Sequence, residues 1–359
     1  MSKLVVTAVG PGTSVQDGGR FGAQRYGLTP SGAIDRLALA AANCLVGNAT
    51  FTAAIEIGPL DAVFTARDGA VRVALSGATR PADVAGRTVA INQSITLADG
   101  ESLRLGVARG GVFSYLAIEG GVRGVPMFGS LAVNARAGLG SPYPRPLQPG
   151  DKLQVAPASG GGERRLDLPP PPEAPIRVVM GPQDDEFGGA KELFLGSEWR
   201  ISATSDRMGY RLEGPVIKHL YGHNIVSDGT VNGSVQVPGN GQPIVLMPDR
   251  GTSGGYPKIA TVISADLGRF GQTQAGRGFR FKSVSMAAAQ AEYRMMIDLL
   301  RSLPERIRDA NDLVLDIEAL QSANVAGAAV NAFDVRTWAI QPPADTQDQD
   351  SFTQADTTS

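Results

Sequence analysis

One polar loop, PDRGTSGGYPK at residues 248–258, gathers the residue types that chemistry on a small molecule needs. Asp249 has the carboxylate of a general base, Lys258 and Arg250 can hold an anion, and Tyr256 supplies a hydroxyl group. Glycines let the main chain approach a ligand closely. We therefore predict that the loop forms one wall of an active site and that its catalytic residues are Asp249, Lys258 and Tyr256. The predicted substrate contacts here are Gln236, Thr252, Ser253, Gly254 and Gly255.

Short apolar runs flank this loop and must position it. Residues 231–237 and 244–247 carry two such runs, and PGNGQP between them indicates a hairpin turn. A third run, IATVISADL, follows at residues 259–267. A loop held between strands can present side chains and backbone N–H groups to a ligand. The alternative is a glycine-rich hairpin with ordinary surface charges, because short motifs often match by chance.

Two further pairs of charged residues are candidates for substrate binding. Asp17 and Arg20 lie in a glycine-rich loop at residues 11–22, after an apolar strand. Arg207 and Arg211 lie in SDRMGYRLEGP, and arginine suits bidentate recognition of a carboxylate. A structural Asp–Arg brace is an equally good interpretation of each pair, and the residues alone leave both open.

Three long blocks carry a resemblance to a known family: residues 10–48, residues 205–215, and QVPGNGQPIVLMPDRGTSGGYPKIATVISADL at 236–267. In the same order, these blocks resemble the KipA-like family. It is also called allophanate hydrolase subunit 2 or the biotin-dependent carboxyltransferase family, and it includes the C subunit of prokaryotic 5-oxoprolinase. Three blocks in register are more specific than one short motif. AGRGFRF at 275–281 departs from the acidic turn expected there, so no role of that acid is carried over.

The resemblance implies a cyclophilin-like β-barrel architecture and a role in a multi-subunit enzyme. The implied activity is the ATP-dependent opening of the lactam ring of 5-oxoproline to glutamate, a hydrolase reaction performed with a KipI-like B subunit and with the A subunit of 5-oxoprolinase. One alternative is the carboxyltransferase subunit of a urea amidolyase-like carboxylase. Its biotin would sit on a separate carrier, because this chain has no Met-Lys-Met motif. Another alternative is a regulatory protein that binds a KipI-like kinase inhibitor.

Composition narrows the class of protein. The 359 residues are 42% hydrophobic and 19% charged, and the net charge of −2 gives no indication of a nucleic-acid or membrane partner. No signal peptide or long apolar span is evident, so we expect a cytoplasmic protein. No P-loop occurs, so ATP is expected to act at the level of the complex. His219 and His223 have no further ligands nearby in the sequence, and we predict no metal site.

Apolar runs of four to eight residues, separated by Gly, Asp or Pro, predict a mostly β protein with a few helices and two domains. The predicted division is an N-terminal β-rich domain at 1–156, a Gly/Pro-rich linker at 157–175, a C-terminal cyclophilin-like domain with terminal helices at 176–340, and a disordered tail at 341–359.

Helical spacing of apolar residues predicts three helical regions. The first runs from Ser31, as its N-cap, to Gly47, with Asp35 in its first turn. The others are residues 286–310, broken near Pro304, and residues 311–320.

Overall fold

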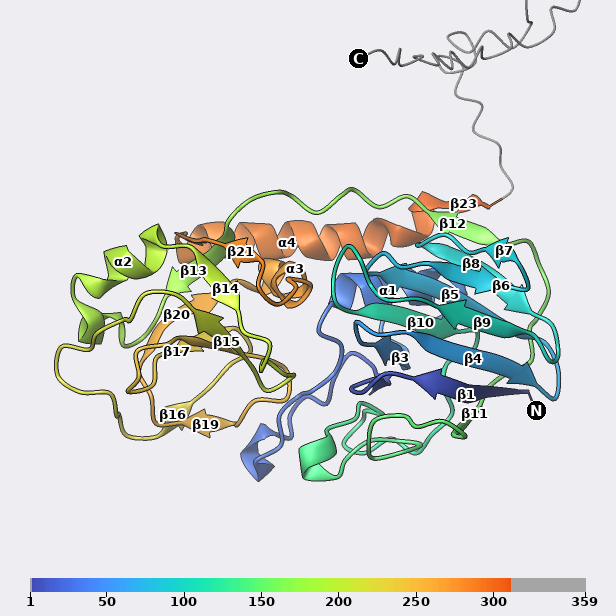
Figure 1. The fold of residues 1–359 in the computed structure, drawn as a ribbon, viewed down its shortest axis with the longest axis horizontal. Coiled ribbons are helices and arrows are strands. Elements are labelled where there is room, and N and C mark those ends of the chain that lie inside the picture. The colour runs from blue at the N-terminus through green and yellow to red at the C-terminus, as the bar shows by residue number, and fades with distance from the viewer. Residues whose placement is uncertain (1, 311–359) are drawn as a thin grey trace, which may run out of the picture. The chain divides into compact units, whose positions relative to one another are not determined.

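The fold is mostly β with a few helices, which confirms the prediction (Figure 1). A computed structural model describes residues 2–310 of the chain. The helix predicted at 311–320 and the tail predicted at 341–359 lie outside the described residues. Within residues 2–310, no helix is long and apolar enough to cross a membrane.

The first half of the chain forms two antiparallel sheets that pack face to face around one core. In the order of hydrogen-bonded neighbours, the six-stranded sheet contains β11 (Lys152–Gln154), β1 (Lys3–Val9), β4 (Ala62–Arg67), β9 (Ser102–Leu105), β6 (Ala82–Val84) and β7 (Arg87–Thr88). The seven-stranded sheet contains β2 (Ser14–Gln16), β3 (Ala54–Ile57), β10 (Ser114–Ile118), β5 (Val71–Gly77), β8 (Gln93–Leu97), β12 (Arg164–Leu166) and β23 (Ile307–Asp309). Alternation along the strands turns Leu4 and Phe64 of one sheet toward Val73 and Leu116 of the other.

The second half forms an eight-stranded sheet that curls into a barrel. Its order is β21 (Gly278–Phe279), β14 (Trp199–Ile201), β15 (Gly209–Glu213), β18 (Ile244–Leu246), β17 (Ser234–Gln236), β20 (Lys258–Val262), β13 (Ile176–Met180) and β22 (Phe281–Ser283). The two edge strands, β21 and β22, are separated by Arg280 alone. Since one residue joins opposite edges, the sheet must bring those edges together, which makes it nearly closed. Trp199, Phe194 and Phe281 fill its interior.

The predicted hairpin around PGNGQP is present, because β17 and β18 pair in antiparallel register. A two-stranded ribbon of β16 (Asp228–Gly229) and β19 (Ser253–Gly254) extends from the loop that follows it. The segment at 275–281 is a turn, with Gly276 at φ 78°, that leads into β21 and β22. The turn therefore forms without the acid expected there.

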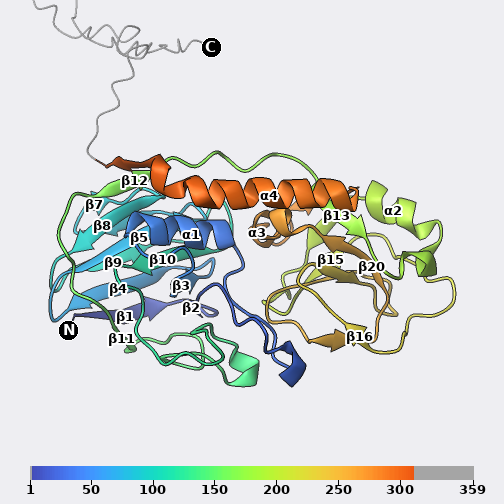
Figure 2. The ribbon, with the colours of Figure 1, turned by 180° about the vertical axis from the view of Figure 1, so that it is seen from behind.

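Helices cover one side of the sheets. The α-helices are α1 (Arg36–Leu45), α2 (Ala190–Gly196), α3 (Leu267–Gly271) and α4 (Met286–Ser302); short 3-10 turns are η1 (Gln24–Tyr26), η2 (Ala135–Ala137), η3 (Asp184–Phe187), η4 (Ser264–Asp266) and η5 (Leu303–Arg306). Helix α4 runs from the second half back along the first (Figure 2). Its last turn places Leu300 in the same core as the alanine-rich face of α1. Helix α4 ends just before Pro304, as predicted.

The prediction that Ser31 caps the first helix is wrong. Helix α1 begins at Arg36 with Asp35 as its N-cap, and Oδ1 of Asp35 accepts a hydrogen bond from the N–H of Ala38 at 3.0 Å. Ser31 lies instead in a left-handed backbone conformation, with φ 53°, and its N–H donates to the carbonyl of Pro248. Residues 31–34 are thus an approach to the helix that contacts the polar loop. Gly47 follows the helix at φ 73°, as predicted for a C-terminal glycine.

The segment at 157–175, predicted to be a linker, contains the strand β12. Arg165 of this strand pairs with both β8 and β23. The rest of the segment, which includes PPPPEAP, has no regular secondary structure apart from a bend. The domain boundary placed here stays a prediction.

Gln272, just after α3, connects the two halves through four hydrogen bonds. Its Oε1 accepts the N–H groups of Val112 and Phe113 at 2.8 and 2.9 Å. Its Nε2 donates to Oδ2 of Asp35 and to the carbonyl of Phe113, both at 2.9 Å. One side chain therefore serves the approach to β10 and the N-cap of α1 at once.

We predict that Gln272→Ala lowers the free energy of unfolding by about 2–4 kcal/mol, because two part-buried backbone N–H groups lose their acceptor. Chemical denaturation of the purified protein measures the change. Gln148→Ala, at an exposed position, is the control and should stay within about 0.5 kcal/mol. A Gln272→Ala change as small as that of the control would contradict the assigned role.

Candidate functional site

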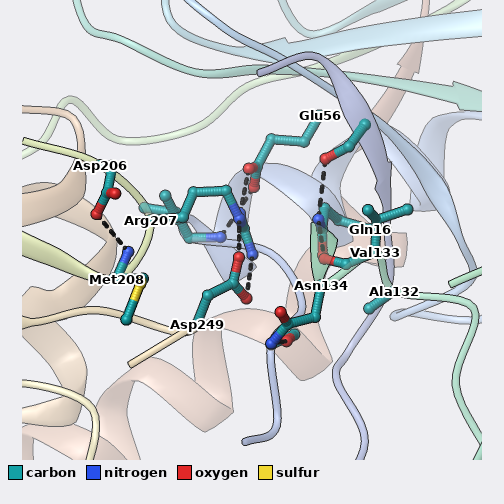
Figure 3. Close-up of polar contacts among 12 residues, drawn as sticks. Gln16, Glu56, Ala132, Val133, Asn134, Asp206, Arg207, Met208 and Asp249 are labelled. Carbon is teal, nitrogen blue, oxygen red and sulfur yellow. Dashed lines mark hydrogen bonds and ion pairs between the residues drawn. The ribbon is translucent and has the colours of Figure 1, made fainter. Parts of the chain in front are cut away.

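One arginine, Arg207, lies at the centre of the polar contact between the two halves, and its side chain is only 15% exposed (Figure 3). Its guanidinium group is held between two carboxylates. Nε is 2.8 Å from Oδ2 of Asp249, and Nη2 is 3.3 Å from Oδ1 of the same carboxylate. Nη1 donates to Oε1 of Glu56 on β3, and Nη2 also donates to the carbonyl of Gly32 at 2.7 Å. Arg207 therefore joins the polar loop of the second half to a strand and a loop of the first.

Glu56 is the most enclosed member of this group, with a side chain that is 0% exposed. Its Oε2 accepts hydrogen bonds from the N–H of Ile34 at 3.0 Å and from the hydroxyl of Tyr115 at 2.7 Å. The Tyr115 hydroxyl in turn accepts from the N–H of Asp35 at 2.8 Å. A buried carboxylate needs such a full set of donors, because an unpaired charge in the interior is very costly.

The charges of this group shift the pKa values of its members. Burial alone would lower the pKa of Arg207, but the carboxylates of Glu56 and Asp249 outweigh burial and raise it, so the guanidinium stays charged. Burial raises the pKa of Tyr115 well above its ordinary value, and the negative charge of Glu56 adds to the effect. Tyr115 therefore acts as a hydrogen-bond donor rather than as a phenolate.

Asp17 and Arg20 lie in a loop that packs against this group from the first half. Both oxygens of Asp17 are used within that half: Oδ1 accepts from Gly19 N–H at 2.8 Å and from the Ser130 hydroxyl at 2.7 Å, and Oδ2 accepts from Leu131 N–H at 2.7 Å. Arg20 is 1% exposed, and its Nη2 donates to the carbonyl of Ala132. The carboxylate of Asp17 thus braces its own loop, and Arg20 uses only part of its donor set.

The backbone of this loop comes very close to itself. Gly32 has φ +81°, and a Cβ atom there would lie 2.7 Å from the backbone nitrogen of Gly19. Glycine is therefore required at position 32, where the carbonyl also accepts from Arg207.

Lys258 does not pair with Asp249. It lies at the start of β20 and is 3% exposed, and its Nζ is 2.9 Å from Oδ2 of Asp228 on the two-stranded ribbon. The hydrogen bond from Lys258 lowers the pKa of Asp228. Instead of one Asp249–Lys258 contact, the structure has two separate ion pairs, one between Asp249 and Arg207 and one between Lys258 and Asp228.

The other residues predicted from the loop take varied positions. Gln236 is 7% exposed, its Nε2 is 3.4 Å from the carbonyl of Tyr256, and a side chain at Gly254 would collide with it. The Tyr256 side chain is 40% exposed. Ser253 and Gly254 form β19, which pairs with β16. The carbonyl of Thr252 accepts from Thr230 N–H, and the carbonyl of Gly255 accepts from Ile225 N–H.

Arg211 lies apart from Arg207. It is exposed on β15, beside a shallow depression of about 180 Å³ that Ser202, Glu213 and Gln242 also line. Tyr210, the preceding residue, points inward and donates to the carbonyl of Gly271 at 2.8 Å. Because neighbouring residues on a strand face opposite sides, Arg211 and the enclosed polar group belong to different faces. A ligand-binding role for Arg211 stays a prediction.

Sequence reasoning missed Glu56 and Tyr115 as members of the site. A signal was present for Glu56, which is the one acid within the apolar strand AIEI. A charge between two isoleucines on a fully buried strand implies a partner in the interior. Tyr115 gave no comparable signal, because tyrosine is ordinary in a buried strand. Within the described residues, no group of three His, Cys, Asp or Glu side chains could hold a metal ion.

The fold and this site define a carboxyltransferase-type domain, and comparison with known proteins agrees. Residues 26–283 match the family described as carboxyltransferase domain, subdomain A and B, and the chain belongs to that family. It is 37% identical to the C subunit of 5-oxoprolinase from Escherichia coli over 299 residues, which cover 80% of this chain and 93% of that protein. It is 35% identical to the C subunit of 5-oxoprolinase from Haemophilus influenzae, over 77% of this chain and 89% of that protein. The predicted family is thereby confirmed.

Solved structures of larger proteins contain the same fold. TTHA0988 has a TM-score of 0.72 and 34% identity, and the match covers 79% of this chain but only 56% of that chain. The urea amidolyase of K. lactis has a TM-score of 0.78 and 27% identity, and the match covers 84% of this chain but 20% of that chain. This chain therefore spans about half of the former and a fifth of the latter.

We predict that Arg207→Met lowers the free energy of unfolding by about 3–5 kcal/mol, because it leaves Glu56 as an unpaired charge in the interior. Glu56→Gln combined with Arg207→Met should cost less than the sum of the two single changes, since the pair is then removed together. Denaturant titration of the four proteins in this cycle measures the coupling.

The matched control is Arg200→Met, which breaks an exposed pair with Glu198 and should cost about 1 kcal/mol or less. Additive single changes at Glu56 and Arg207 would mean that the ion pair does not hold the halves together.

Proposed function

We propose that this chain is the C subunit of an ATP-dependent 5-oxoprolinase, a hydrolase that opens the lactam ring of 5-oxoproline to give glutamate. The observation that carries the proposal is the similarity to two proteins named as the C subunit of 5-oxoprolinase, which spans about nine-tenths of each. The urea carboxylase and urea amidolyase relatives are 27–29% identical, and the matches cover only 17–24% of their length. Those proteins support a carboxyl-transfer function less well.

The chemistry asks for a base, a cation near a developing oxyanion, and fixed N–H donors. A lactam is a stable amide, so its carbonyl is activated at the expense of ATP before water attacks and the C–N bond breaks. Asp249 is suited to accept the proton of that water, because Arg207 fixes the orientation of its carboxylate. Lys258 and the backbone N–H groups of Gly254 and Gly255 are suited to hold negative charge on the carbonyl oxygen.

ATP is a substrate of the complex in this proposal, and we assign its binding to the partners. The sequence contains no P-loop pattern, which is the motif whose backbone N–H groups cradle phosphates. Biotin would enter only under the carboxyltransferase alternative, on a separate carrier protein. The partners proposed here are a KipI-like B subunit and the A subunit of 5-oxoprolinase.

An exposed apolar cluster beside the site supports binding of a partner subunit. Tyr26 of η1 and Phe128 have ring centroids 6.0 Å apart, and they are 60% and 52% exposed. Phe21 is 67% exposed in the same loop as Tyr26. Aromatic side chains left in water together are typical of protein–protein contacts.

We predict that Asp249→Asn lowers kcat by about 10²–10⁴-fold, because the amide keeps the shape of the carboxylate but cannot accept a proton. The measurement is ATP-dependent release of glutamate from 5-oxoproline by the reconstituted complex. Asp68→Asn, at an exposed carboxylate of the first half, is the control and should retain wild-type kcat. Turnover by Asp249→Asn within about threefold of wild type would remove Asp249 from the catalytic role.

Lys258→Met should also lower kcat if the ammonium group holds the oxyanion, whereas Asp228→Asn, which leaves that ammonium in place, should lower it less. The same glutamate assay measures both variants. Equal losses in the two would indicate that Lys258 serves only its ion pair.

We further predict that Phe128→Glu weakens the complex with the KipI-like partner at least tenfold, because it places a charge within an apolar contact. Co-purification and size-exclusion chromatography at micromolar concentrations test this. Val107→Glu, at another exposed apolar position, is the control. Unchanged binding by Phe128→Glu would place the partner elsewhere.

A further inference from the structure

Two buried arginines, Arg20 and Arg250, carry donor groups that the described residues leave unused. Arg20 is 1% exposed and Arg250 is 5% exposed. In each, Nη2 donates to a backbone carbonyl, that of Ala132 for Arg20 and that of Thr230 for Arg250. The Nε and Nη1 atoms of both are enclosed and have no acceptor within residues 2–310. Such groups are rare in proteins, because a buried N–H without an acceptor is costly.

Arg80 shows how this fold satisfies a buried arginine when the role is structural. Its Nε donates to the Ser114 hydroxyl at 2.9 Å, its Nη1 to the Leu60 carbonyl at 3.0 Å, and its Nη2 to the Gly58 carbonyl at 2.7 Å. All three nitrogens of Arg207 are likewise paired. Against that standard, the two open nitrogens on each of Arg20 and Arg250 indicate a missing acceptor.

Both arginines lie where the loop of residues 17–32 meets the polar loop of the second half. Gln24 Nε2 and Arg250 Nη2 donate to the same carbonyl, that of Thr230, at 3.2 and 3.3 Å. Arg20 lies within range of the charge of Asp249, which precedes Arg250 in the chain. The two guanidinium groups therefore flank the carboxylate proposed as the base.

We propose that Arg20 and Arg250 bind the carboxylate of the substrate and so act as its specificity determinants. This inference rests on the proposed function, since 5-oxoproline carries a carboxylate next to its lactam nitrogen and urea carries none. A guanidinium group matches the two oxygens of a carboxylate with two parallel N–H bonds, and each arginine has two nitrogens free for this.

Electrostatics agrees with an anionic ligand. Burial lowers the pKa of Arg20, and Asp17 and Asp249 only partly oppose that effect. Burial also lowers the pKa of Arg250. A bound carboxylate would stabilise the charged form of both side chains, because an opposite charge at short range favours it.

The test uses the reconstituted complex with 5-oxoproline as substrate and 2-pyrrolidinone, the same lactam without the carboxylate, as competitor. Arg20→Met and Arg250→Met should each raise KM for 5-oxoproline about ten- to hundredfold, the loss expected for a charged hydrogen bond. The inhibition constant of 2-pyrrolidinone should stay within about threefold of its wild-type value. Kinetics of both compounds on each variant give the comparison.

Two arginine controls separate recognition from stability. Arg67→Met removes an exposed arginine on β4 and should leave KM unchanged. Arg80→Met removes a fully bonded buried arginine and should lower Tm, whereas Arg20→Met should leave Tm of the ligand-free protein unchanged or raise it. An unchanged KM in Arg20→Met or Arg250→Met, or an equal loss of affinity for both lactams, would overturn the proposal.

A second measurement distinguishes failure of this inference from failure of the proposed function. In the isolated protein, saturating 5-oxoproline should raise Tm, and the shift should be lost in both variants. A wild-type complex that does not turn over 5-oxoproline would reject the proposed function. Persistence of the Tm shift in the variants would reject the arginine site, whatever the activity of the complex.

Discussion

The ion bridge of Arg207 is the interaction on which the rest of the structure depends. A guanidinium group largely removed from water is tolerated only when carboxylates and carbonyls surround it. Here one carboxylate, Glu56, comes from a strand of the first half, and the other, Asp249, comes from the polar loop of the second. The halves must therefore dock correctly before the charges are satisfied. The same contact fixes the carboxylate that is proposed to act as the base.

The supporting structure is consistent with this constraint. Tyr115 holds Glu56, Gln272 holds the approach to β10, and Asp35 serves both as N-cap of α1 and as an acceptor for Gln272. Each of these side chains makes contacts in more than one element. By contrast, Arg20 and Arg250 lie in the same region with donors unpaired. A rigid, fully bonded framework next to incompletely bonded cations is the arrangement expected where a ligand completes the hydrogen bonding.

Much of the fold could be predicted from the sequence, because strand patterns are local. The run VRVALSG forms β5 at the predicted residues, and the PGNGQP turn joins the predicted strands. The start of α1 could not be predicted in this way, since Ser31 and Asp35 are both good N-caps. What excludes Ser31 is its contact with Pro248, which is distant in sequence. The boundary within 157–175 rests on composition alone, and composition did not indicate β12.

The site was harder to predict, because its members come from distant segments of the chain. Residue type correctly drew attention to Asp249 and Arg207, but only tertiary structure pairs them with each other and with Glu56. Lys258, at the far end of the same loop as Asp249, pairs instead with Asp228 because β19 and β16 form a ribbon. Spacing along a glycine-rich loop does not determine which charges meet, since that depends on the strands at its ends.

The central claim is that the substrate binds where the loop of residues 17–32 meets the polar loop after Met247. A crystal structure of the reconstituted complex with 5-oxoproline tests it most directly. The account predicts density for the lactam within hydrogen-bonding distance of Asp249, with the substrate carboxylate on Arg20 and Arg250. Density for 5-oxoproline bound wholly within a partner protein, with these three side chains unchanged, would contradict it.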